Sequence, residues 1–144
     1  SNYTEGPSLS AGSPSFWGGG PDTGSLVGFP GYHAPWEAEH AFDVRDSQNI
    51  VIEDCEADSV WGDGVYVGNS VSNPSDGVIL RRLNLRFTGR QGIGAANCRN
   101  VVIDDVTVDH GRRAAIDLEP FSTTGFVTDV EIKNCDLFPR QVCR

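Results

Sequence analysis

One short pattern recurs four times along the chain and constrains the fold more than any other feature. The copies are Ile52-Glu53-Asp54-Cys55, Leu80-Arg81-Arg82-Leu83, Ile103-Asp104-Asp105-Val106 and Ile132-Lys133-Asn134-Cys135, and the steps between them are 28, 23 and 29 residues. In the first three copies a second apolar segment follows 13 residues later, at Val65, Ile93 and Ile116. A constant 13-residue spacing with variable loops between copies is typical of a solenoid, in which each repeat stacks on its neighbours.

Length and charge limit the classes of protein that fit. A chain of 144 residues has room for one domain. Its net charge of −9 repels phosphate backbones, so we expect no nucleic-acid partner. No run of about 18 apolar residues is present, so we expect no membrane span. Residues 1–38 are rich in Gly, Ser and Pro and are expected to form an irregular arm or cap, whereas residues 39–144 form the repeat domain.

The repeats predict an all-β fold with three short strands in each coil. The first set of strands is expected near residues 50–52, 55–57 and 65–67, and equivalent sets follow in the next two copies. Asn49, Gly77, Asn100 and Asp129 occupy equivalent corners, and these residue types tolerate a left-handed backbone. Cys55, Ala57 and their equivalents in the other copies are apolar and are expected to face the core.

The charged columns support this alignment. Stacked strands lie about 4.8 Å apart, so equivalent residues of neighbouring copies become neighbours in space. The signs alternate in three columns, which are Glu53, Arg81, Asp104, Lys133, then Asp54, Arg82, Asp105, and then Asp58, Arg86, Asp109. Like charges would destabilise such stacking, so we interpret these residues as structural charge ladders and not as catalytic groups.

Residues 40–138 resemble the right-handed parallel β-helix of the pectate-lyase-like superfamily. The resemblance depends on the stacked apolar strands, the Asn corner, and segments such as Trp61-Gly62-Asp63-Gly64-Val65. It implies a solenoid of about four to five coils with three short strands per coil. Members of this superfamily include lyases, hydrolases, epimerases and purely structural proteins, so the fold alone does not fix an activity.

The four cysteines do not indicate a disulfide framework. Cys55 and Cys135 share an inward column but lie three coils apart, roughly 14 Å by strand spacing, and a disulfide needs Cα atoms within about 7 Å. Both are therefore expected to be buried free thiols. The sequence leaves undecided whether Cys98 and Cys143 form a disulfide.

Candidate functional residues gather at the third strand of each coil and the turn before it. Gly94 and Ala96 should leave a bare floor between Tyr66 and the pair Asp117 and Glu119. The candidate catalytic residues are Asp63, Tyr66, His110, Asp117 and Glu119, and the candidate substrate-binding residues are Trp61, Arg90, Gln91, Arg112 and Arg113. Structural roles are the alternatives. Asp63 would then be a turn residue, Asp117 and Glu119 partners of arginines, His110 a turn cap, and Trp61 and Tyr66 surface residues packed under a loop.

Two kinds of chemistry stay open for these residues. Inverting hydrolysis needs two carboxylates about 6.5–9.5 Å apart, and the rise of a strand places Asp117 and Glu119 about 6.8 Å apart. A lyase or epimerase would bind a uronate carboxylate through an arginine and move protons through Tyr66 or His110. The superfamily's polygalacturonases carry an Asp-Asp and a Gly-His-Gly segment. Here Gly62-Asp63-Gly64 has a single aspartate at the matching place and His110-Gly111 lacks the first glycine, which argues against that activity.

The sequence therefore predicts a secreted or cell-surface protein that binds an extended acidic polysaccharide, and it leaves open whether the protein also cleaves that chain by lyase or hydrolase chemistry. The alternative is a non-catalytic structural or adhesive protein, with a homo-oligomer formed through an open end of the solenoid. Calcium would suit an acidic groove, although no segment has a dedicated calcium-binding pattern; no other cofactor is expected.

Overall fold

A computed structural model describes residues 39–111, 113–120 and 122–139, and these segments form an all-β fold without helices. The strands are β1 (Phe42–Arg45), β2 (Gln48–Val60), β3 (Val65–Gly68), β4 (Ser75–Thr88), β5 (Ile93–Ala96), β6 (Cys98–Gly111), β7 (Ile116–Leu118), β8 (Val127–Lys133) and β9 (Asp136–Pro139). The predicted arm at residues 1–38 lies outside the described residues.

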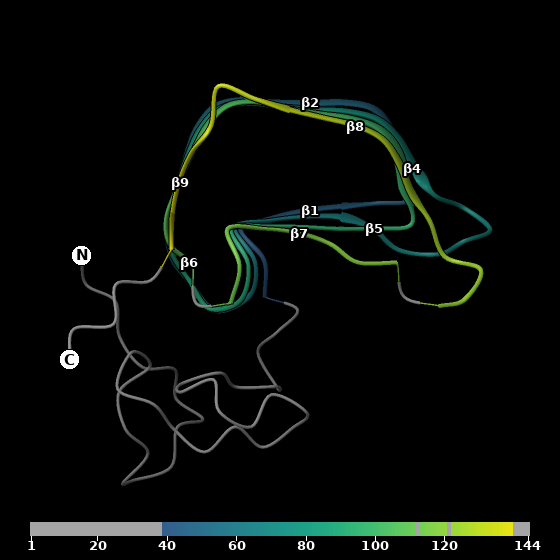
Figure 1. Cartoon of the computed structure of the whole chain (residues 1–144), viewed down its shortest axis with the longest axis horizontal. Coiled ribbons are helices and arrows are strands. Elements are labelled where there is room, and N and C mark those ends of the chain that lie inside the picture. The colour runs from purple at the N-terminus through teal and green to yellow at the C-terminus, as the bar shows by residue number, and fades with distance from the viewer. Residues whose placement is uncertain (1–38, 112, 121, 140–144) are drawn as a thin grey trace, which may run out of the picture.

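The strands form two parallel sheets that pack against each other. One sheet has the order β1-β3-β5-β7, and the other has the order β2-β4-β6-β8, with β9 paired to β6. The chain alternates between the sheets, so each of the first three repeats adds one strand to each, and the fourth adds β7 to one sheet and β8 and β9 to the other (Figure 1). We call these additions levels: β1 and β2 form the first, β3 and β4 the second, β5 and β6 the third, and β7 to β9 the fourth.

The expectation of a right-handed parallel β-helix with three short strands per coil is wrong. The segments predicted as first and second strands are one continuous strand of 13 or 14 residues in β2, β4 and β6. Asp54, Arg82 and Asp105 have φ values of 55°, 52° and 54°. A single left-handed residue bends the strand, and the pairing resumes directly after it, as between Glu53↔Arg81 and Cys55↔Leu83. The result is two sheets and not three.

The predicted register is confirmed by the strand pairing. Ile52 pairs with Leu80, Leu80 with Ile103, and Ile103 with Ile132. The corner column is confirmed as well, because Asn49, Gly77, Asn100 and Asp129 all have φ between 54° and 70°. Side-chain types that accept this conformation therefore occupy every copy of the corner.

The core lies between the two sheets and consists of equivalent apolar side chains from successive levels. Val65, Val67 and Ile93 of one sheet and Leu80, Leu85 and Ile103 of the other are fully buried. Each such side chain contributes about 1.5–3 kcal/mol by leaving water. The levels must therefore stack on one another, since a single level has too few apolar contacts to fold alone.

The charge ladders of the first two levels form as predicted. Arg81 Nε lies 2.5 Å from Glu53 Oε2, Arg82 Nε lies 2.6 Å from Asp54 Oδ1, and Arg86 Nη2 lies 2.7 Å from Asp58 Oδ2. These pairs are partly exposed, so each contributes at most about 1 kcal/mol. Their chief effect is on register, because a shifted strand would place like charges together.

The cysteines that the structure describes are free thiols. These are Cys55, Cys98 and Cys135. Cys55 and Cys135 are free, as predicted, but they are only partly buried and not buried as expected. Burial raises the pKa of the Cys98 thiol to about 11. Cys143 lies outside the described residues.

Gly68 is predicted to be indispensable for the packing of β3 on β5. Its φ is +144°, and a Cβ at this position would lie 1.6 Å from the carbonyl oxygen of Ala96. Gly68→Ala should therefore lower the free energy of unfolding by about 3 kcal/mol or more, measured by chemical denaturation. Gly77→Asn is the control: asparagine already occupies the equivalent corners at Asn49 and Asn100, so its effect should stay below about 1 kcal/mol. Equal losses in the two variants would contradict this explanation.

Candidate functional site

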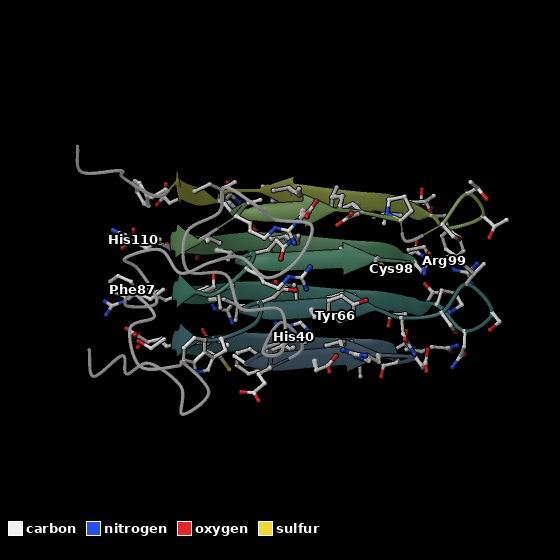
Figure 2. All side chains as sticks on the ribbon, turned by 90° about the horizontal axis from the view of Figure 1, so that it is seen from below. His40, Tyr66, Phe87, Cys98, Arg99 and His110 are labelled. Carbon is white, nitrogen blue, oxygen red and sulfur yellow. The ribbon has the colours of Figure 1, made fainter. Side chains whose placement is uncertain are left out.

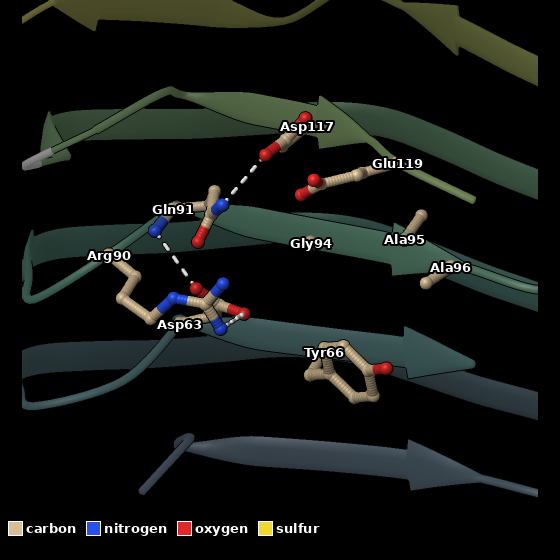
Figure 3. Close-up of a pocket in the computed structure, with 9 residues that line it drawn as sticks. All are labelled: Asp63, Tyr66, Arg90, Gln91, Gly94, Ala95, Ala96, Asp117 and Glu119. Atoms are coloured by element: carbon tan, nitrogen blue, oxygen red, sulfur yellow. Dashed lines mark hydrogen bonds and ion pairs between the residues drawn. The ribbon is translucent and has the colours of Figure 1, made fainter. Parts of the chain in front are cut away.

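A small hollow, open to solvent, lies on the sheet β1-β3-β5-β7. Its lining residues are Asp63, Tyr66, Arg90, Gln91, Gly94, Ala95, Ala96, Asp117 and Glu119 (Figure 3). Ile93 and Ala95 belong to the core, so their neighbours Gly94 and Ala96 face the other side of the sheet. The hollow therefore lies on the outer face of the sheet.

Strand pairing across three levels builds the floor of the hollow. Tyr66 of β3 pairs with Gly94 of β5, which pairs with Asp117 of β7. Because Gly94 has no side chain, a gap remains between the phenol and the carboxylate. The sequence predicted this bare floor, and the register confirms it.

Asp63 is the most buried ionisable group of the hollow, with 1% of its surface exposed. Its Oδ1 accepts a hydrogen bond from the backbone N–H of Gln91 at 2.9 Å, and its Oδ2 lies 3.6 Å from Arg90 Nη1. Burial raises the pKa of Asp63 to about 6, and the charge of Arg90 limits that rise. The carboxyl thus fixes the turn before β5 and still exchanges a proton near neutral pH.

Gln91 connects Asp63 to Asp117 across two levels. Its backbone N–H binds Asp63, and its side-chain Nε2 donates to Asp117 Oδ2 at 2.7 Å. The side chain is buried, and its Oε1 has no hydrogen-bond partner among the described residues. A buried acceptor without a donor costs free energy, about 1–3 kcal/mol, that a bound donor would recover.

His40 completes the site, and sequence reasoning missed it. Its Nδ1 accepts a hydrogen bond from the backbone N–H of Asp63 at 3.0 Å, and the ring stacks on Tyr66 with centroids 4.9 Å apart (Figure 2). The side chain is 2% exposed, and burial lowers the pKa of His40 to about 4. The only sequence signal is that His40 precedes Asp63 by 23 residues, which is one of the repeat steps.

Tyr66 is held on more than one side. Besides His40, Arg45 lies over its ring, with the guanidinium carbon 4.9 Å from the ring centroid. Burial raises the pKa of Tyr66 to about 12. Its phenol is therefore protonated at neutral pH, which fits a hydrogen-bond donor better than a base.

Six of the predicted site residues line the hollow together: Asp63, Tyr66, Arg90, Gln91, Asp117 and Glu119. Others lie elsewhere. His110 stacks on Phe87 at the end of β6, with ring centroids 4.9 Å apart (Figure 2). Trp61 and Arg113 are partly buried and do not line the hollow, although the charge of Arg113 acts on Asp63. Arg112 lies outside the described residues.

Residues 39–139, apart from positions 112 and 121, contain neither a metal-binding cluster nor a membrane-spanning helix. No group of three or more His, Cys, Asp or Glu side chains there is arranged to hold a metal ion. That part of the chain also has no helix with the length and apolar character needed to span a membrane.

No protein-family model, no curated protein and no solved structure matches this chain. The resemblance to the pectate-lyase-like superfamily is therefore corrected, because these comparisons give it no support and the strands form two parallel sheets. The chemistry of that superfamily is accordingly not carried over to this protein.

Gly94 is predicted to hold Asp63 in place by leaving it room. A Cβ on Gly94 would lie 2.8 Å from Asp63 Oδ2, so Gly94→Ala should push this oxygen away from Arg90. The pKa of Asp63 should then rise further above its ordinary value, as followed by NMR titration of the carboxyl carbon. Ala96→Gly, on the same floor, is the control and should leave this pKa unchanged. An unaltered titration in Gly94→Ala would contradict the close contact.

Asp63 and His40 are predicted to oppose each other in the pH dependence of stability. The pKa of Asp63 rises to about 6 on folding, so its contribution to the free energy of unfolding falls as pH rises from about 4 to 6. The pKa of His40 falls to about 4, so its contribution rises between about pH 4 and 6.5. In the unchanged protein these two effects nearly cancel.

Single substitutions should expose each effect. Relative to the unchanged protein, the stability of Asp63→Asn should increase with pH across this window, and that of His40→Gln should decrease. Each slope should approach about 1.4 kcal/mol per pH unit in denaturant unfolding at several pH values. Parallel curves for the two variants would contradict the assigned shifts.

Proposed function

We propose that the hollow binds a hydroxyl-rich carbohydrate chain on the outer face of β3, β5 and β7. The observation that carries the proposal is Gln91: its amide is buried, its Nε2 is used by Asp117, and its Oε1 lacks a donor beside an unfilled floor. Sugar hydroxyls both donate and accept hydrogen bonds, so one hydroxyl can satisfy this oxygen while its neighbours bind the carboxylates.

The charge of the hollow favours a neutral carbohydrate over the acidic polysaccharide expected from the sequence. Asp117 and Glu119 lie at its exposed side, and Arg90 lies beside Asp63. A uronate carboxylate would meet two further carboxylates and an arginine that already has an anionic neighbour. Such like-charge contacts are unfavourable, whereas neutral hydroxyls bind carboxylates well.

Hydrolysis of a glycosidic bond is the second candidate, supported by the different environments of Asp63 and Asp117. Asp63 is buried with a pKa raised to about 6, whereas Asp117 is only partly buried, on β7. Two carboxyl groups in unlike environments are the usual basis for one general acid and one base. Gln91 holds both, so their separation is fixed by the strand stacking.

Binding is tested by isothermal titration calorimetry with soluble neutral and acidic polysaccharides. We expect binding of a neutral polysaccharide, weakened about tenfold by Asp117→Asn, because a charge-assisted hydrogen bond is lost. Asp105→Asn is the matched control: this exposed aspartate lies on β6, in the other sheet, at a φ of 54° that asparagine also accepts. It should bind normally.

The same preparations, assayed for new reducing ends, test hydrolysis. Cleavage that Asp63→Asn abolishes while binding persists would support the second candidate. Binding without cleavage would support the first candidate, a carbohydrate-binding protein, and contradict the second. Absence of binding to every polysaccharide, or equal binding by the Asp117 and control variants, would overturn the proposed site.

A further inference from the structure

The fourth level exposes apolar side chains that are buried in every inner copy. Leu118, Ile132 and Leu137 are 42%, 43% and 40% exposed. Their paired equivalents on the third level are Ala95, Ile103 and Val108, at 2%, 0% and 0%. The inner face of the fourth level thus has the character of a core surface with one side uncovered.

The first level exposes less apolar surface. There the core-facing Val44 and Ala57 are 5% and 8% exposed, and Phe42, Ile50 and Ile52 are partly buried. The two ends of the described stack therefore differ in degree, and a second copy of the fourth level offers a surface of the same apolar character. An interface that uses the same patch on both copies has two-fold symmetry, the commonest arrangement among homo-oligomers.

Strand β8 is the free edge of its sheet at this end. It pairs with β6 on one side and with no described strand on the other. An edge strand presents unpaired N–H and C=O groups that a second strand can satisfy. Two-fold symmetry about an axis normal to the sheet makes the second β8 antiparallel and keeps both inner faces on the same side.

Charge selects the register of this pairing. Opposite residues of an antiparallel pair share a face, so the registers that align the inner faces centre on Val130, Glu131 or Ile132. The register centred on Val130 places Asp129 against Glu131 of the second copy. The register centred on Glu131 places Glu131 against Glu131 of the second copy. The register centred on Ile132 places Lys133 against Glu131 of the second copy, twice, with no like charges opposed.

We propose that two copies of this chain associate through the fourth level, with β8 of each pairing antiparallel around Ile132. Lys133 Nζ already lies 3.1 Å from Glu131 Oε1 on its own strand. The symmetric pair forms a square of two lysines and two glutamates above a contact between the two Ile132 side chains. Head-to-tail stacking in the same register would place Lys133 against Glu53, but it would also oppose two pairs of like charges, Asp136 with Glu56 and Asp117 with Asp43.

Light scattering coupled to size-exclusion chromatography tests the proposal on the whole chain. We expect a dimer that Ile132→Glu converts to monomer. Val51→Glu is the matched control, because Val51 is a 50% exposed apolar residue on β2, at the opposite end of the stack. It should remain dimeric, and circular dichroism should show that both variants stay folded.

Charge exchange tests the register itself. Glu131→Lys and Lys133→Glu should each raise the dissociation constant about tenfold, because two attractive contacts become repulsive. The double variant restores opposite charges and should return the constant to its original range. A monomer at all concentrations, an open series of oligomers sensitive to Val51→Glu, or a double variant as weak as the single ones would each overturn the proposal.

Discussion

In-register parallel stacking is the constraint on which this structure depends. Each repeat places equivalent residues directly above one another, at a strand spacing of about 4.8 Å. Apolar columns then become the core, as with Leu80 above Ile103, and ionic columns become ladders, as with Glu53 beside Arg81. The same rule requires left-handed residues to align, since one strand bends only where its neighbour does.

The stacking also explains how residues distant in sequence form one site. Asp63, Gln91 and Asp117 come from three successive levels, and the hydrogen bonds of Gln91 link the outer two. Their positions are fixed by the backbone pairing of β3, β5 and β7 and not by flexible loops. A site of this kind is rigid before any ligand arrives, which lowers the entropy cost of binding.

The sequence predicted the register and the bare floor because period and charge alternation both report on stacking. It did not predict the number of sheets, since a single left-handed residue such as Arg82 bends a strand without ending its pairing. His40 was missed because it lies before the first strand, in a turn position whose equivalents, Asp63 and Gln91, are of other residue types. The burial of Asp63 was missed for a related reason: turn residues between glycines are usually exposed, and here His40 and Arg90 surround the carboxyl.

The fourth level continues the charge ladder through Lys133, which pairs with Asp104, and adds a second charge on the same strand. In inner levels opposite signs lie on neighbouring strands, as with Glu53 and Arg81, which suits parallel stacking of unlike copies. Strand β8 carries both signs itself, at Glu131 and Lys133. A strand with both signs two residues apart complements an identical strand only when that strand is reversed. Lys133 therefore serves two patterns: it faces Asp104 inside the stack, at 3.9 Å from Oδ2, and in the proposed dimer it faces Glu131 of the second copy.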